Sequence, residues 1–137
     1  MFNAINVSTS GLIAQRQRMN TIASNIANIG TTRNAEGKTE PYQRRKITFS
    51  AEMDALRSGQ ASIPVRGQVE LDEESQPRPV LDPGHPDANA EGIVLYPGIK
   101  MVEEFTNAIA ASRAYEANVT TMNMSKRMAE MALRLLG

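Results

Sequence analysis

The chain has 137 residues, enough for one domain, and its 15 basic and 15 acidic side chains give a formal net charge of zero. It contains no cysteine, which excludes disulfides, thiol nucleophiles and thiolate metal sites. Only 4% of its residues are aromatic, so a large central core is not expected, and the balanced charge favours neither nucleic acid nor an anionic membrane.

The N-terminal segment is predicted to be a helix over residues 3–28. Its apolar residues recur at seven-residue spacing, with two more at half-heptad positions: Ile5, Leu12, Met19 and Ile26, then Ile22 and Ile29. Residues 8–11 are poor helix formers, so this helix is expected to be weak alone and to become ordered by packing. Gly30 is expected to follow the helix end with a positive φ.

The middle of the chain is predicted to be extended and turning. Asn34, Gly37 and Pro41 interrupt the chain after the first helix. Alternating residues predict strands at 42–49, 63–71 and 92–96, with a short helical turn at 51–57 and an extended, irregular, proline-rich stretch at 76–87. Three short strands suffice for a hairpin but hardly for an independent globular domain.

The C-terminal segment is predicted to be a second long helix, from about residue 100 to 136. Its apolar residues form a first stripe and then a shifted one: Val102, Phe105, Ile109, Val119 and Met122, followed by Met124, Met128, Met131 and Leu135. With so little between the helices to bury these stripes, the ends must pair with each other, with copies of the chain, or with both.

The sequence therefore predicts a mainly α fold, with long N- and C-terminal helices paired as an antiparallel coiled coil and a short β-hairpin or extended middle segment. The corresponding division places the N-terminal helix at 1–30, the middle at 31–100 and the C-terminal helix at 101–137. This is the plan of a polymerising subunit and not of an enzyme.

The sequence offers little catalytic chemistry. The single histidine, His85, lies between prolines and beside Asp82 and Asp87, an arrangement more typical of a structural turn than of a metal site or of a hydrolase. No nucleophile motif or phosphate-binding glycine loop is present. We therefore expect no catalytic residue, no cofactor, no metal, no nucleic acid and no small-molecule substrate. The run 44–46 is better explained as a charged edge strand than as a phosphate site.

Charge and hydropathy along the chain give two further expectations. Basic residues gather at 33–46 and acidic residues at 70–91, either as solvated faces or as complementary surfaces between neighbouring subunits. No apolar run is long enough to insert into a membrane, and the first residues lack a signal-peptide pattern. The chain is thus expected either to stay inside the cell or to leave it without a cleaved signal.

Two segments resemble a known family. Residues 23–33, Ala-Ser-Asn-Ile-Ala-Asn-Ile-Gly-Thr-Thr-Arg, are similar to the signature that ends the first helix of bacterial flagellar rod, hook and hook-associated proteins. Residues 109–119, Ile-Ala-Ala-Ser-Arg-Ala-Tyr-Glu-Ala-Asn-Val, are similar to the signature of that family's last helix. Residues 82–88 and 92–97 resemble the proximal rod type in particular. One departure is the longer connection before Tyr42, where many relatives have Thr-Pro-Gly-Tyr.

The resemblance implies a subunit of the basal-body rod, the axial drive shaft through the periplasm that transmits torque and encloses the export channel. It implies export by the flagellar type III apparatus without a cleaved signal, and partners among other rod subunits and copies of the chain. The alternatives are a soluble helical-bundle adaptor or export chaperone, and a small hydrolase using His85, Asp82 and Asp87.

The candidate site is an assembly interface on the two helices. Apolar positions are expected to pack between subunits, and polar signature positions to fix the register of the helices, because a shifted arrangement would bury them unpaired. These residues are Leu12, Met19, Asn25, Ile26, Asn28, Ile109, Arg113, Tyr115, Asn118, Val119 and Met128.

Overall fold

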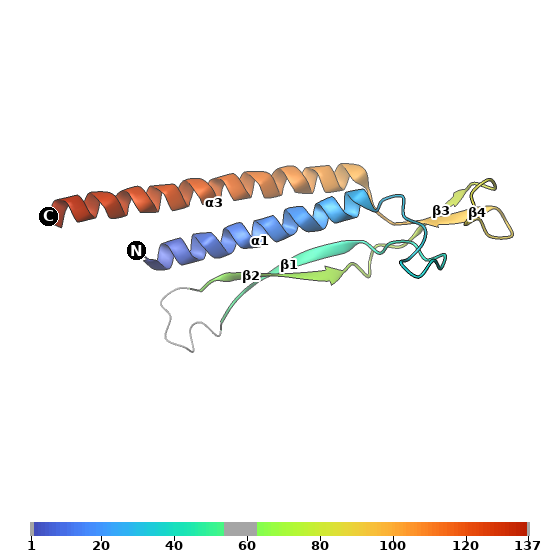
Figure 1. Cartoon of the computed structure of the whole chain (residues 1–137), viewed down its shortest axis with the longest axis horizontal. Helices are drawn as coiled ribbons and strands as arrows, with labels where there is room; N and C mark the ends of the chain where they lie inside the picture. Colours follow the sequence, from blue (N-terminus) through green and yellow to red (C-terminus); the bar gives the residue numbers. More distant parts are fainter. Residues whose placement is uncertain (1, 54–62, 137) are drawn as a thin grey trace. The chain divides into compact units, whose positions relative to one another are not determined.

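The computed structural model describes residues 2–53 and 63–136. Two long helices, α1 (Phe2–Ala27) and α3 (Met101–Leu136), begin and end this part of the chain (Figure 1). Between them lie four strands: β1 (Arg45–Ala51), β2 (Val65–Leu71), β3 (Arg78–Leu81) and β4 (Ile93–Tyr96). The two predicted terminal helices and the β-structured middle are confirmed. Neither helix, over the described residues, is both long and apolar enough to cross a membrane.

The chain divides into two compact units. Unit 1 comprises Met1–Met19, Ile47–Gln68 and Ala108–Gly137, and unit 2 comprises Asn20–Lys46 and Val69–Asn107. Each unit therefore takes part of both helices and part of the middle segment, and this division cuts across the three predicted sequence segments.

Strands β1 and β2 form an antiparallel pair. In unit 2 the amide of Asp72 donates to the carbonyl of Arg44 (2.8 Å), and in unit 1 the amide of Glu52 donates to the carbonyl of Pro64 (2.9 Å). The first predicted strand begins three residues late, because the Tyr42 amide bonds to the Thr31 carbonyl instead (3.1 Å). The helical turn expected at 51–57 falls largely outside the described residues.

Strands β3 and β4 form a second antiparallel pair in unit 2, in which Val80 lies opposite the fully buried Val94. The stretch predicted at 76–87 to be extended and irregular is extended at residues 78–81, but there it forms a regular strand and the predicted irregularity is wrong. Pro79 is compatible with this strand because a two-stranded sheet leaves alternate amide positions without a partner strand. The strand predicted at 92–96 is confirmed.

The end of α1 differs from the expectation. The helix ends at Ala27, and among the described residues only Gly37 and Gly92 have positive φ, so the positive φ predicted for Gly30 is wrong. Asn28 closes the helix instead. Its amide makes the last helical hydrogen bond, to the Ser24 carbonyl (3.1 Å), and its side-chain Nδ2 donates to the same carbonyl (2.9 Å).

Burial along the helices follows small and polar residues more than apolar ones. The buried apolar residues described are few: Ala14, Ile22, Val94, Ile99 and Ala111. In unit 1, a Cβ added to Gly11 would come within 3.0 Å of the Asn118 side chain, so the two helices approach closely there. Glycine permits such an approach because it has no Cβ.

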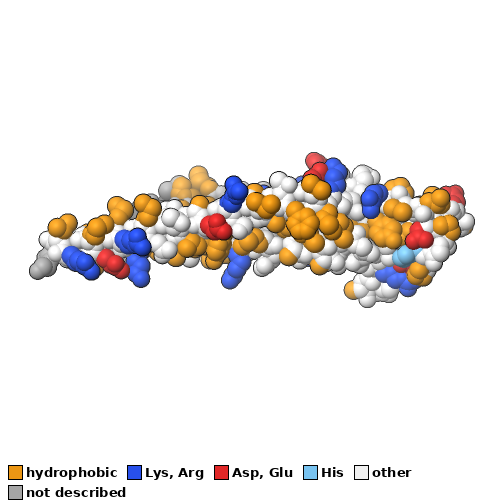
Figure 2. Space-filling model, turned by 90° about the horizontal axis from the view of Figure 1, so that it is seen from above, with side chains coloured by type: hydrophobic (Ala, Val, Ile, Leu, Met, Phe, Trp, Pro, Cys, Tyr) orange, Lys and Arg blue, Asp and Glu red, His pale blue; other side chains and the backbone are white. Residues whose placement is uncertain are grey.

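The apolar stripe of α3, in contrast, is exposed within the chain. Figure 2 looks onto the side where α3 lies and has rows of hydrophobic side chains at its surface. The large apolar residues that remain exposed on α3 are Met101, Val102, Phe105, Ile109, Met124, Met128, Met131, Leu133 and Leu135. A single chain therefore leaves this stripe in water, and its side chains are available to a partner.

Candidate functional site

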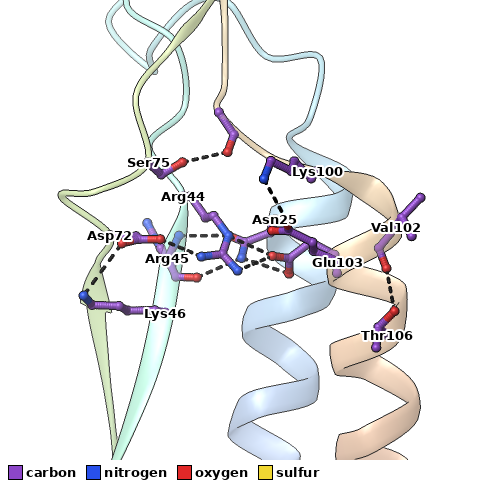
Figure 3. A network of polar contacts seen from close by, with 12 residues as sticks. Asn25, Arg44, Arg45, Lys46, Asp72, Ser75, Lys100, Val102, Glu103 and Thr106 are labelled. Atoms are coloured by element: carbon purple, nitrogen blue, oxygen red, sulfur yellow. Dashed lines mark hydrogen bonds and ion pairs between the residues drawn. The ribbon is translucent and has the colours of Figure 1, made fainter.

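Unit 2 holds a buried polar cluster built from both helices and from the chain at the ends of β1 and β2. We call it the polar cluster. Three of its members are Asn25 from α1, Arg44 just before β1 and Asp72 just after β2 (Figure 3). The fourth is Glu104, from the first turn of α3. Glu104 and Asn25 are each only 1% exposed. Because burying a carboxylate without partners is unfavourable, the hydrogen bonds around Glu104 determine what the cluster does.

Glu104 is held from two sides. Its Oε1 accepts from Arg44 Nε at 2.8 Å and lies 2.7 Å from Arg44 Nη2. Its Oε2 accepts from Asn25 Nδ2 at 3.2 Å. The start of α3 is thus connected both to α1 and to the segment that enters β1, and each oxygen of the carboxylate has a partner.

Asn25 behaves like an extra strand residue beside β1. Its Nδ2 donates to the Arg45 carbonyl at 2.8 Å, and its Oδ1 accepts the Arg45 amide at 3.0 Å. The Tyr42 hydroxyl reaches the same Oδ1 at 3.3 Å. The side-chain amide therefore fixes the register between α1 and β1 within the chain, since a shift of one residue would leave these groups buried and unpaired.

Arg44 links two carboxylates. Its Nη1 donates to Asp72 Oδ2 at 2.6 Å while its Nε and Nη2 face Glu104, and Lys46 lies 3.7 Å from the other Asp72 oxygen. Burial lowers the pKa of Arg44, but the hydrogen bonds to Glu104 and Asp72 outweigh it and hold the pKa above its ordinary value. For Asp72, burial raises the pKa, and the Arg44 hydrogen bond and charge outweigh it, so the pKa is lowered.

A second polar group surrounds Asp87. One carboxylate oxygen accepts the Thr32 hydroxyl at 2.7 Å, and the other pairs with Arg33. The Thr32 hydrogen bond is the main reason that the pKa of Asp87 is lowered; burial opposes it, and Arg33 adds to it. Asp87 therefore fastens the connection after α1 to the turn between β3 and β4.

His85 is part of the turn that the sequence predicts. Its amide donates to the Asp82 carbonyl at 3.2 Å, and its Nδ1 accepts the Asp87 amide at 3.1 Å. Its ring packs edge-on against Tyr96, with ring centroids 6.1 Å apart. The structural turn is confirmed. Both Asp87 oxygens are already bonded, so these residues do not form the free acid–base pair that the hydrolase hypothesis needs.

Metal binding has no support in the described parts of the chain. Residues 2–53 and 63–136 contain no group of three or more His, Asp or Glu side chains placed to hold a metal ion.

The predicted assembly residues fall into three groups. Ile109 and Met128 are exposed, 59% and 61%, and Arg113 is exposed one helical turn after Ile109. Leu12, Met19, Ile26, Asn28, Tyr115 and Val119 are half-buried. Asn25 is buried in the polar cluster, and the half-buried Asn118 lies against Gly11. The structure thus brings the inward polar residues into intrachain contacts and leaves the apolar α3 residues at the surface.

Sequence reasoning missed most of the polar cluster. No local pattern in the sequence distinguishes Glu104. Arg44 and Asp72 stand out only as members of a basic run and of an acidic run. The one available signal was the pair of acids at the predicted start of the last helix, Glu103 and Glu104, where a carboxylate is favoured by the helix dipole. That signal does not say which acid is buried.

Several residues of the basic run at 33–46 form ion pairs with residues of the acidic run at 70–91 within one chain. Arg33 pairs with Asp87, and Arg44 and Lys46 pair with Asp72. These particular residues therefore have charged partners within the chain, although the Arg33 and Lys46 side chains are still 51% and 44% exposed.

Comparison with known proteins agrees with the resemblance seen in the two signatures. Residues 5–33 match the family described as "Flagella basal body rod protein", and residues 90–135 match "Flagellar basal body rod FlgEFG protein C-terminal". The chain is similar to the flagellar basal-body rod protein FlgC of Bacillus subtilis (strain 168), at 37% identity over 145 residues, 98% of this chain and 97% of the relative.

Two further relatives have the same printed name. The chain is 38% identical over 151 residues to FlgC of Borreliella burgdorferi, with 99% of this chain and 97% of the relative covered. It is 33% identical over 135 residues to FlgC of Salmonella typhimurium, with 98% and 97% covered. These rod proteins are structural proteins and not enzymes. The chain therefore belongs to the flagellar basal-body rod protein family, as a structural rod subunit of the FlgC type.

Proposed function

We propose that this rod subunit polymerises through its helices into the axial drive shaft of the basal body, where it transmits torque and helps to enclose the export channel. Family membership supports a place in the flagellar basal-body rod and assembly with other rod components. The finer parts of the proposal are copies of the chain as partners, passage through the flagellar type III export apparatus without a cleaved signal, and a position in the periplasm-spanning part of the rod.

Within the subunit, we propose that α1 and α3 pair as an antiparallel coiled coil. Contacts in unit 2 support this direction: Asn25 near the end of α1 contacts Glu104 at the start of α3, and Ile29 and Met101 line one hollow. In unit 1, Gly11 faces Asn118. The two contacts are 14 residues apart on each helix, since Gly11 precedes Asn25 by 14 residues and Asn118 follows Glu104 by 14. Fourteen residues are two heptads, and the opposite directions are those of an antiparallel coiled coil.

The exposed apolar stripe of α3 is the single observation that supports assembly most directly. Val102, Phe105 and Ile109 are each more than half exposed. A closed helical bundle, as the adaptor or chaperone alternative requires, would turn such residues inward. A polymerising subunit instead leaves them for its neighbours, where burying one such side chain contributes about 1.5–3 kcal/mol.

We further propose that Ile109, Met128, Val119, Leu12, Met19 and Ile26 contribute apolar contacts between subunits. Arg113 lies beside Ile109 on the exposed side of α3, and its planar guanidinium suits a carboxylate or carbonyl groups on a neighbour. Asn25, Asn28, Tyr115 and Asn118 would act within the subunit by holding the register of the elements that carry the assembly surface.

The proposal is tested by replacing Ile109 with Asp in cells and measuring motility and basal-body formation. Because the side chain is exposed in the single chain, we expect the free energy of unfolding to change by only about 0.5 kcal/mol, while rod assembly fails. Ala110→Asp is the matched control, because it places the same charge on the neighbouring exposed residue, away from the stripe. Normal swimming with Ile109→Asp would contradict the proposed assembly surface.

A further inference from the structure

The two compact units have opposite charge, although the chain as a whole is neutral. Unit 1 contains eight basic and four acidic residues, a formal charge of +4, and unit 2 contains seven basic and eleven acidic residues, a formal charge of −4. Contacts between like units of two copies are repulsive, and contacts between unlike units are attractive.

The C-terminal half of α3, in unit 1, combines positive charge with exposed apolar side chains. Arg127 and Arg134 are seven residues apart, so they lie on one side of the helix, next to the exposed Met128 and Met131. Neither arginine has an ion-pair partner among the described residues. Figure 2 shows basic side chains (blue), with an acidic one (red) among them, beside a row of hydrophobic ones (orange) over this part of the helix. The exposed Glu130 lies between the two arginines in the sequence, so the basic charge of this side exceeds the acidic charge by one. We call this the basic α3 face.

Unit 2 has a surface of the opposite kind where β2 ends. An open hollow there is lined by Lys46, Glu70, Leu71, Glu73 and Glu74. Lys46 is turned toward Asp72, whereas the three glutamates are exposed without an ion-pair partner in the described chain. Leu71, 53% exposed, supplies an apolar contact in the middle of these carboxylates. We call this the acidic β2 surface.

We propose that the basic α3 face of one copy of this chain docks on the acidic β2 surface of a second copy. This inference rests on the proposed function. It adds which surfaces of the two copies meet, and that the contact is between two different surfaces. Exposed methionines would contact Leu71, while the two arginines face the glutamates. Apolar burial gives the contact its affinity, and the paired charges exclude the reverse arrangement, since like charges brought together are repelled.

The proposed contact joins two different surfaces of the same chain. Such heterologous contacts repeat from copy to copy and give open polymers unless the rotation closes a ring. A symmetric contact through the α3 faces of two copies would instead bring four arginines together. The separation of charge between the units therefore favours propagation over a closed dimer, which is what a rod subunit needs.

Sedimentation velocity of the full chain tests the contact. Self-association is measured at about 0.01 M salt, where the Debye length is about 30 Å, and at about 1 M, where it is about 3 Å. Arg127→Glu is compared with Lys126→Glu. Both substitutions make the same charge change at adjacent residues, but Lys126 points about 100° away around the helix.

The acidic β2 surface is tested by a chain that carries both Glu73→Lys and Glu74→Lys, which reverse its charge. Glu91→Lys is the control for this pair, because Glu91 is also exposed and lies in unit 2.

We expect association to weaken at high salt. Arg127→Glu should raise the dissociation constant about tenfold or more, and Lys126→Glu and Glu91→Lys should have much smaller effects. The chain that combines Arg127→Glu with Glu73→Lys and Glu74→Lys should recover association, because both surfaces are reversed together. Circular dichroism should give the same helix content for every variant.

Three results would overturn the contact: no self-association of the unaltered chain, equal effects of Arg127→Glu and Lys126→Glu, or no recovery in the combined variant. Binding of this face only to a different rod protein would also exclude a second copy as its partner. Cells expressing Arg127→Glu separate this inference from the proposed function. Normal motility there, with loss of motility for Ile109→Asp, would leave the rod function in place and remove only this contact.

Discussion

Arg44 and Glu104 are separated by 60 residues in the sequence, yet two nitrogens of the Arg44 guanidinium lie within 2.8 Å of a single Glu104 oxygen. The contact joins the segment entering β1 to the first turn of α3, and Asn25 of α1 completes it through the other carboxylate oxygen. Three segments that the sequence places far apart are thus held by one buried carboxylate. The cluster gives unit 2 a definite arrangement where its apolar core is small.

Replacing Glu104 with Ala should destabilise the chain. The change leaves Arg44 with one carboxylate in place of two and removes the Asn25 contact, and breaking a buried ion pair from one side costs about 3 kcal/mol or more. The free energy of unfolding is measured by urea denaturation followed by circular dichroism. Glu103→Ala is the control, because its pair with Lys100 is exposed and should contribute less than about 1 kcal/mol. Equal effects of the two substitutions would mean that the cluster does not stabilise the fold.

Acid should weaken unit 2 through Asp72 and Asp87. Both carboxyl groups have a pKa lowered below the ordinary value of about 3.9. The stability that they contribute is therefore fully present above about pH 4 and is lost as the pH falls through their folded-state pKa values. Melting temperatures measured from pH 7 down to pH 2 should fall at the acidic end. The Asp87→Asn variant should have a lower melting temperature at pH 7, and its melting temperature should fall less between pH 7 and pH 2. If the melting temperature falls as much with acid as in the unaltered chain, the role of Asp87 is contradicted.

These long-range contacts could not be predicted from the sequence. Periodicity was enough to predict both helices and most of the strands, because 3.6- and 2-residue patterns are local properties. The partners of Asn25 and Asp72 come from distant segments, 79 residues away for Glu104 and 28 for Arg44, so no local pattern identifies them. The error at Gly30 is of another kind, since the chain leaves the helix at Asn28 without a residue of positive φ there.

The inward face of the helices was also hard to predict. A search for apolar stripes finds Phe105 and Ile109, which the single chain leaves exposed. Of that search's positions Ile22 is buried, but where the helices approach each other the residues are small or polar, such as Gly11, Ala111 and Asn118. Where two helices approach closely, the residues between them must be small. A search for apolar periodicity finds hydrophobic residues and therefore misses these small ones. In a subunit that assembles, the most apolar face can therefore be the one reserved for neighbours.

Replacing Arg113 with Lys should lower motility while the helix content stays unchanged. Arg113 is exposed beside Ile109, and lysine keeps its charge but not its planar, two-nitrogen geometry. A swimming assay is compared with circular dichroism of the purified variant. Ser112→Ala, at the neighbouring exposed position, is expected to swim normally. If Arg113→Lys swims as well as the unaltered chain, Arg113 makes no geometry-dependent contact in the rod.

Residues 12–26 should exchange their amide hydrogens readily in the dilute, unassembled chain. The poor helix formers at 8–11 precede this stretch, and few apolar side chains are buried against it, so local opening is inexpensive. Hydrogen exchange followed by mass spectrometry should record weak protection in the monomer and strong protection in purified basal bodies. Strong protection in both states would mean that the helix is already stable before assembly.

The central claim is that the exposed stripe of α3 is covered by neighbouring subunits in the rod. A photo-activated crosslinking residue at position 109 tests it most directly, in cells that swim and in a strain whose rod assembly is blocked. The account predicts crosslinks to another rod subunit or to a second copy in assembled basal bodies, and none in the blocked strain. Crosslinks confined to the same chain, or none at all in assembled basal bodies, would contradict it.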